Sequence, residues 1–288
     1  MNWIILILLS AVFLSVRTIL TKKILQSQNT LPLLFYISLL STLGMMVFYP
    51  EISLNVSLAT FLLILLKSGI IALTWYCLYT AYKKLDISIV SPLQNLGPLF
   101  VVLFAFLFLG EQVGWINYAG IFLLITSAYL LKLESFRDLL KPFRFFRSHY
   151  FLLILVAVMG NSTSAVLDKI LLKTINYHSL MFLFFAQLSI IFLVMIVLRR
   201  ETAQLNMFTG KYAVGMVLAI SGAAFLADYF YFQAVAMPGT LIILIIPLRK
   251  TSILLIILVG GSVFNEKYLI QKTIVTLVMI LAVVMISY

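Results

Sequence analysis

The sequence predicts an all-α integral membrane protein with ten transmembrane helices. Of the 288 residues, 64% are apolar and only 10% are charged, whereas a soluble domain carries roughly 25% charged residues. The apolar residues gather in runs of about 20, the length that a helix needs to cross a bilayer. These runs do not alternate in polarity, and lipid offers no hydrogen-bond partner to open backbone, so helices are expected rather than strands.

Ten apolar stretches follow one another along the chain. They cover residues 3–25, 31–49, 58–81, 87–109, 114–132, 150–172, 178–198, 212–236, 239–263 and 268–287. The connections are short except for residues 133–149, where leucine and phenylalanine recur at helical spacing among basic residues. That pattern predicts a basic amphipathic linker lying in the membrane surface.

The two halves of the chain share an order of features. Pro92 stands 19 residues before Glu111, and Pro247 stands 19 residues before Glu266. A Lys-Ile-Leu triplet also ends the first and the sixth stretch. We therefore expect two five-helix repeats, residues 1–132 and 150–288, with both prolines bending or loosening their helices. Five helices is an odd number, so the second repeat enters the membrane inverted, as in many secondary transporters.

The net charge of +11 is distributed asymmetrically. Most basic residues follow odd-numbered stretches: Lys22, Lys23, Lys83, Lys84, Lys132, Arg137, Lys141, Arg144, Arg147, Arg199, Arg200, Lys211, Lys267 and Lys272. The positive-inside rule then places these loops in the cytoplasm and both termini outside a cell membrane. Basic residues between apolar runs suit an anionic lipid surface, so no nucleic-acid partner is expected.

Short motifs add a family resemblance. Leu-Gly-Glu at 109–111, followed by Asn-Tyr-Ala-Gly at 117–120, and a degraded copy, Phe-Asn-Glu at 264–266, resemble the EamA-type branch of the drug/metabolite transporter superfamily. The resemblance implies a transporter of metabolites, amino acids or drugs, with a cavity between the third, fourth, eighth and ninth helices. It also implies cytoplasmic termini, opposite to the charge asymmetry.

Other kinds of chemistry lack their motifs. There is no Gly-rich phosphate loop ending in Lys-Ser or Lys-Thr, so ATP-driven transport by this chain alone is not expected. The two histidines, His149 and His178, have no metal-binding spacing, and no serine–histidine–acid set is present. We expect no metal and no cofactor.

Charged residues deep in the eighth and ninth stretches are the main candidates for a substrate site. Asp228 lies before the turn near Pro238, and Arg249 and Lys250 lie after it. At 1.5 Å per residue, Asp228 lies about 13 Å, and Arg249 and Lys250 about 16 Å, from the membrane surface at that turn. Two antiparallel neighbouring helices therefore bring the carboxylate and the cations within reach of each other. The alternative is a purely structural ion pair. With two cations facing one carboxylate, a positive charge is left over, and Asp228 is a candidate acceptor of a coupling proton or a partner for a substrate ammonium group.

Further candidates are polar or aromatic groups at similar depth. The proline alignment makes Gln94 and Asn95 the equivalents of Arg249 and Lys250. Tyr76, Tyr229 and Tyr231 are candidate cavity rings, and Asn161, Asp168 and Arg17 are secondary candidates. A purely structural interpretation competes with each candidate. The rings could simply fill the membrane core, Asn161 and Asp168 could hold helices together, and Arg17 could snorkel to the surface. Lys67 is expected at the edge of a shifted third helix.

These observations favour a secondary transporter, exporter or exchanger, of a small anionic or zwitterionic metabolite. A lipid flippase of the same fold is the alternative, which a lateral opening between helices would favour. A membrane-embedded enzyme would need a cluster of His, Asp or Glu near one interface. A structural or sensory protein would lack deep polar groups. The sequence leaves the oligomeric state open.

Overall fold

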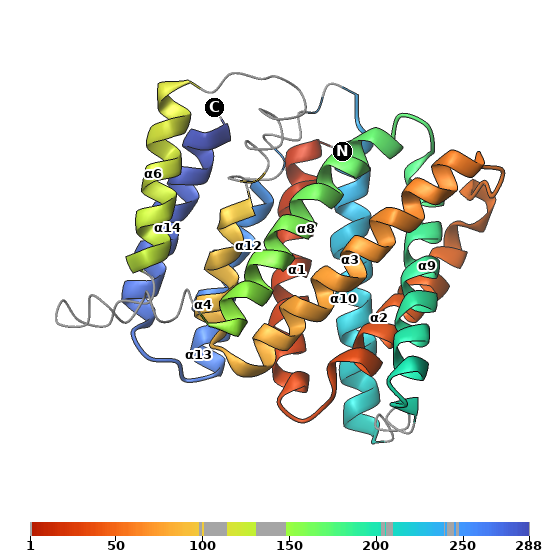
Figure 1. Ribbon diagram of the computed structural model, residues 1–288, viewed down its shortest axis with the longest axis horizontal. Coiled ribbons are helices and arrows are strands. Elements are labelled where there is room, and N and C mark those ends of the chain that lie inside the picture. Colours follow the sequence, from red (N-terminus) through yellow and green to blue (C-terminus); the bar gives the residue numbers. More distant parts are fainter. Residues whose placement is uncertain are drawn as a thin grey trace.

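The computed structural model describes residues 2–97, 100, 114–130, 148–202, 205, 210–238, 240, 245 and 248–287. The described residues form a bundle of helices, and no strand occurs among them (Figure 1). The fold class expected from the sequence is therefore confirmed as all-α.

Six helices in the described part are long and apolar enough to cross a membrane. They are α1 (Trp3–Leu25), α2 (Thr30–Met45) with its 3-10 extension η1 (Met46–Glu51), α3 (Leu58–Lys84), α8 (His149–Leu171), α9 (Tyr177–Leu198) and α10 (Lys211–Ala236). Side chains of Asn2, Ser57, Ser148 and Asn176 cap the first turns of α1, α3, α8 and α9 by accepting backbone hydrogen bonds. The bounds of the six long helices agree with the predicted stretches to within a few residues.

Two shorter apolar helices, α6 (Trp115–Leu130) and α14 (Leu269–Ser287), match the fifth and tenth stretches. The fourth stretch begins as α4 (Ile87–Leu93) and tightens into the 3-10 turn η2 (Gln94–Leu96) just after Pro92. A proline inside a helix removes a hydrogen bond and crowds the preceding turn, and here the helix tightens two residues after the proline. The ninth stretch contains α12 (Ser252–Leu255), the π-helical segment η5 (Ile256–Gly260) and α13 (Gly261–Val263).

Several sequence predictions fall outside the described residues. Glu111, Pro247 and residues 131–147, which hold nearly all of the predicted surface helix, are among them. The ten-helix count, the inverted repeat and the division at 132 and 150 therefore stay predictions.

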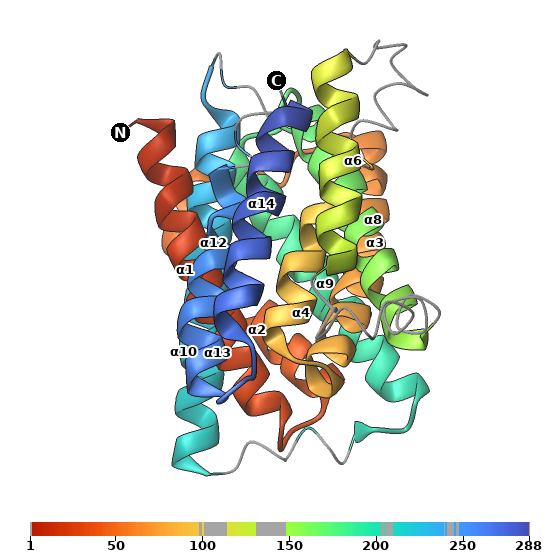
Figure 2. The same cartoon turned by 90° about the vertical axis from the view of Figure 1, so that its left-hand side faces the viewer.

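Helices from the two halves of the chain pack against each other in pairs. The main pairs are α1 with α10, α3 with α8, α2 with α9, and α6 with α14 (Figure 1). The α3–α8 contact is close at Gly160, where an added Cβ would overlap Thr74 Oγ1. Both chain termini lie at the same end of the bundle (Figure 2). The ends of α1, α3 and α9, with their basic residues, lie at the other end.

The outer surface of the bundle is apolar. Large side chains stay more than half exposed on many helices, among them Phe122, Ile190, Ile270 and Leu281. Exposed apolar surface of this extent suits contact with lipid, and together with the six long apolar helices it describes a multi-pass membrane protein.

Candidate functional site

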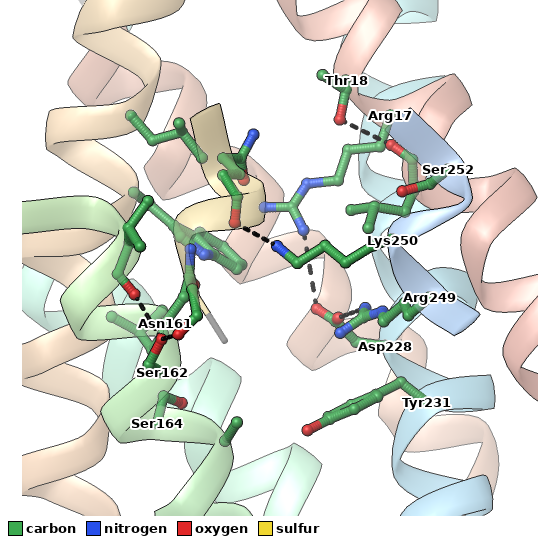
Figure 3. A pocket seen from close by; sticks show the side chains of 18 of the residues that line it. Arg17, Thr18, Asn161, Ser162, Ser164, Asp228, Tyr231, Arg249, Lys250 and Ser252 are labelled. Carbon is green, nitrogen blue, oxygen red and sulfur yellow. Dashed lines mark hydrogen bonds and ion pairs between the residues drawn. The ribbon is translucent and has the colours of Figure 1, made fainter. Parts of the chain in front are cut away.

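A cavity of about 200 Å³ lies in the middle of the bundle, between α1, α3, α8, α10 and the ninth stretch (Figure 3). Its described lining includes six charged side chains: Arg17, Lys67, Asp168, Asp228, Arg249 and Lys250. Charges inside a membrane span are costly and usually face a partner or a cavity. Here they do both.

Asp228 on α10 is the centre of one group. Its Oδ1 accepts a hydrogen bond from Arg249 Nη2 at 2.8 Å, so the predicted contact between these two residues is present. Arg249 is held from its other side by Ser10 Oγ, 3.0 Å from Nε, and its guanidinium lies 4.2 Å from the ring centre of Tyr231. These neighbours fix the guanidinium plane toward the carboxylate.

The second cation at Asp228 is not the one that we expected from the sequence. Arg17 Nη1 lies 3.9 Å from Asp228 Oδ2, whereas Lys250 Nζ donates instead to the backbone carbonyl of Gln94 at 2.9 Å. Adjacent positions on a helix differ by about 100° in direction, so Arg249 and Lys250 reach different sides of the cavity (Figure 3).

The snorkelling interpretation of Arg17 is wrong. The residue is only 6% exposed, its Nε donates to Tyr79 Oη at 3.0 Å, and its guanidinium lies 4.2 Å from the ring centre of Trp75. Because α1 pairs with α10 inside the bundle, the side chain meets aromatic rings and a carboxylate rather than the membrane surface.

The interpretation of Lys67 as a helix-edge residue is also wrong. Ser57 caps α3, which places Lys67 about 13 Å into the helix at 1.5 Å per residue. Its ammonium lies 3.0 Å from Asp168 Oδ1 on α8 and 3.5 Å from the ring centre of Phe184. Tyr231 Oη donates to the other oxygen of Asp168 at 3.5 Å. This second ion pair connects α3 with α8 across the cavity wall.

The other sequence candidates divide into two groups. Gln94, Asn161 and Tyr231 line the cavity. Asn95 is fully buried beside it, and neither polar atom of its side chain has a hydrogen-bond partner among the described residues. Tyr76 lies outside the cavity lining, where its Oη accepts a hydrogen bond from Arg199 at 2.6 Å.

Tyr229 likewise lies away from the lining and stacks between Phe48 and Phe225, with ring centres 5.1 and 6.0 Å away. Tyr76 and Tyr229 were chosen for their depth alone, which does not specify the face of the helix. The α3 lining residues that we did not choose as candidates lie on one helical face with Lys67: Ile71, Trp75, Leu78, Tyr79 and Tyr82. That spacing of three and four residues is the signal that would have identified it.

A second polar cluster joins the two halves at the basic end of the bundle. The carboxylate of Glu266, just after α13, accepts hydrogen bonds from the backbone N–H of Ile87 at 2.8 Å and of Ser88 at 3.2 Å, and from Ser88 Oγ. Lys272 Nζ on α14 donates to Ser88 Oγ at 2.6 Å and lies 3.6 Å from Glu266. A residue of the second half thus caps the first turn of α4 in the first half.

A family model described as the EamA-like transporter family matches residues 1–133. The matched segment runs from α1 to just past α6, and it contributes Arg17, Lys67, Trp75 and Gln94 to the cavity. The EamA-like segment therefore carries about half of the polar lining described above.

No protein with a curated description matches the sequence. A crystal structure described only as that of a protein is 14% identical, with a TM-score of 0.64, and the alignment covers 97% of this chain and 94% of the other. At this identity the likeness shows a shared fold. No group of three or more His, Cys, Asp or Glu side chains in the described segments is placed to hold a metal ion.

Proposed function

We propose that this protein is a secondary transporter that moves a small anionic or zwitterionic metabolite through the central cavity by alternating access. The observation that carries the proposal is a cavity with six charged side chains enclosed by helices of both halves, in a chain whose first half is EamA-like. A volume of about 200 Å³ lies below the roughly 300–1,000 Å³ of sites for drug-sized ligands, which favours a small solute over a lipid.

The helix pairing supports the proposed inverted repeat. Suppose that each of the first five predicted stretches corresponds to the stretch five places later. The first stretch, α1, then corresponds to the sixth, α8, and the third, α3, corresponds to the eighth, α10. The pair α1–α10 then maps onto the pair α8–α3, and both pairs are in contact. Two equivalent interfaces on opposite sides of one cavity suit a rocking motion of one half against the other.

Ion pairs at the cavity provide a means of coupling. Asp228 and Asp168 each bind a cation from another helix, so a substrate or a proton that competes for either carboxylate would alter the contact between those helices. We propose Asp228 as the acceptor of a coupling proton and the cell membrane as the location, with the basic loops on the cytoplasmic side. We assign no catalytic role to any residue.

Uptake and efflux in proteoliposomes, measured with a panel of metabolites with and without a pH gradient, would test this proposal. Asp228→Asn, Arg249→Gln and Lys250→Gln should each reduce transport at matched reconstitution. Tyr76→Phe, at a residue outside the cavity, is the control and should transport normally. Wild-type rates in all three cavity variants would mean that the charges only hold the helices together.

A further inference from the structure

We propose that the transported solute is a small dianion, a phosphate monoester or a dicarboxylate, whose two negative charges are received by Arg17 and Lys250. This inference rests on the proposed transport function, because it names the substrate class of the same cavity. It starts from the charge balance of the lining.

The described lining contains four cations and two carboxylates, which leaves a formal charge of +2. Each carboxylate has one close cation: Arg249 at 2.8 Å from Asp228, and Lys67 at 3.0 Å from Asp168. Within each pair the two charges neutralise each other. Arg17 and Lys250 are the cations left over.

The present partners of these two cations are neutral groups or a carboxylate that another cation already binds more closely. Lys250 Nζ donates to the carbonyl oxygen of Gln94. Arg17 binds the phenol of Tyr79 and faces the ring of Trp75, and its 3.9 Å contact to Asp228 is with a carboxylate that Arg249 already holds. An ammonium has three donors and a guanidinium has five, so both groups keep donors for a guest.

Both side chains extend into the cavity, Arg17 from α1 and Lys250 from the ninth stretch, and α8 with Asn161, Ser162 and Ser164 lies across from them (Figure 3). Two uncompensated charges in a membrane interior are costly. A guest with two negative charges removes that cost, whereas a guest with one leaves half of it. A guanidinium matches carboxylate and phosphate oxygens in a planar fork, which favours oxyanions.

A zwitterion fits the same groups less well. Its ammonium would need a carboxylate, and both carboxylates in the described lining are already paired with cations. Binding a zwitterion would therefore break one of the buried ion pairs, and truncating or unpairing such a pair has a large cost. A dianion leaves both pairs intact.

Titration calorimetry on the purified full-length protein would test the proposal, with inorganic phosphate, glycerol phosphate, succinate, butyrate and glycine as probes. We expect at least one of the three dianions to bind, and butyrate and glycine to bind at least about tenfold more weakly. The measurements with the two phosphates and with succinate distinguish phosphate esters from dicarboxylates. Lys250→Gln and Arg17→Gln should each lower dianion affinity by roughly tenfold to a hundredfold. Lys83→Gln, whose lysine binds Gln28 and Asn29 outside the cavity, is the control.

Lys250→Arg keeps the charge and should keep dianion binding, which separates loss of charge from misfolding. The proposal is overturned if butyrate or glycine binds as tightly as the dianions, if none of the three dianions binds, or if both neutral variants keep wild-type dianion affinity. In those cases transport of a monoanion or zwitterion in proteoliposomes would leave the transporter function standing. If no compound of the panel is transported, the proposed function itself fails.

Discussion

The buried ion pair between Lys67 and Asp168 allows a quantitative test of the cavity architecture. Lys67 is only 1% exposed, and removing one partner of a buried pair typically costs about 3–5 kcal/mol because the other charge is left uncompensated. The two single substitutions should differ, however. In Asp168→Asn, the ammonium keeps the ring of Phe184 at 3.5 Å, and a desolvated cation–π contact contributes about 2 kcal/mol. In Lys67→Met, Asp168 keeps only the hydroxyl of Tyr231, which lies 3.5 Å from its carboxylate.

We therefore expect Lys67→Met to reduce stability by about 3–5 kcal/mol and Asp168→Asn by roughly 1–3 kcal/mol. The double variant contains no buried charge at this position and should lie within about 1 kcal/mol of wild type. Lys169→Met is a matched control, since Lys169 contacts the backbone of Thr240 and is not part of the cavity lining.

The single cysteine provides the assay. Cys77 is buried in α3, so a thiol-reactive dye labels it when the bundle unfolds during heating in detergent. At about 2–4 °C per kcal/mol, Lys67→Met should lower the labelling midpoint by about 6–20 °C, and the double variant should recover most of that loss. A double variant as unstable as Lys67→Met, or an Asp168→Asn variant less stable than Lys67→Met, would refute the reasoning.

Three further predictions concern other parts of the bundle. Glu266→Gln should lower the unfolding midpoint because it removes the buried carboxylate beside Lys272, leaving only the exposed Asp86 at 3.6 Å, and weakens the cap on α4; a midpoint equal to wild type would show that the cluster adds nothing to stability. Gly160→Ala should cost about 1–3 kcal/mol through overpacking, whereas Gly69→Ala, where a Cβ meets open space, should not; equal midpoints would contradict the close α3–α8 contact. In a Cys77→Ser background, an impermeant thiol reagent applied to intact cells should label a cysteine at position 2 and not one at position 140; the opposite pattern would reverse the topology.

The helices could be predicted from the sequence because lipid makes their length and composition unambiguous. The predicted stretch 3–25 coincides with α1, and 178–198 begins one residue after the start of α9. Asp228 and Arg249 were placed together because a tight turn sets the two helices antiparallel at known rise. These inferences needed only distances along one or two neighbouring helices.

The rest of the site depends on contacts between distant parts of the chain. Arg17 was only a secondary candidate, with snorkelling as the competing interpretation, and Lys67 was expected at a helix edge, since each helix was considered alone. The pairing of α1 with α10 and of α3 with α8 encloses both side chains, and no local pattern specifies that pairing. Residue direction was the second difficulty: Tyr76 was chosen over Trp75, although only Trp75 lines the cavity.

Trp75 offers the most direct test that the cavity is the substrate site. The chain has three tryptophans, and Trp3→Phe with Trp115→Phe leaves Trp75, which lies beneath Arg17 in the cavity wall, as the only one. A solute that this variant transports in proteoliposomes should change the Trp75 emission saturably, with the same half-saturating concentration as transport, and Arg17→Gln should weaken both together. Transport at full rate with unchanged Trp75 emission at saturating solute would contradict the account.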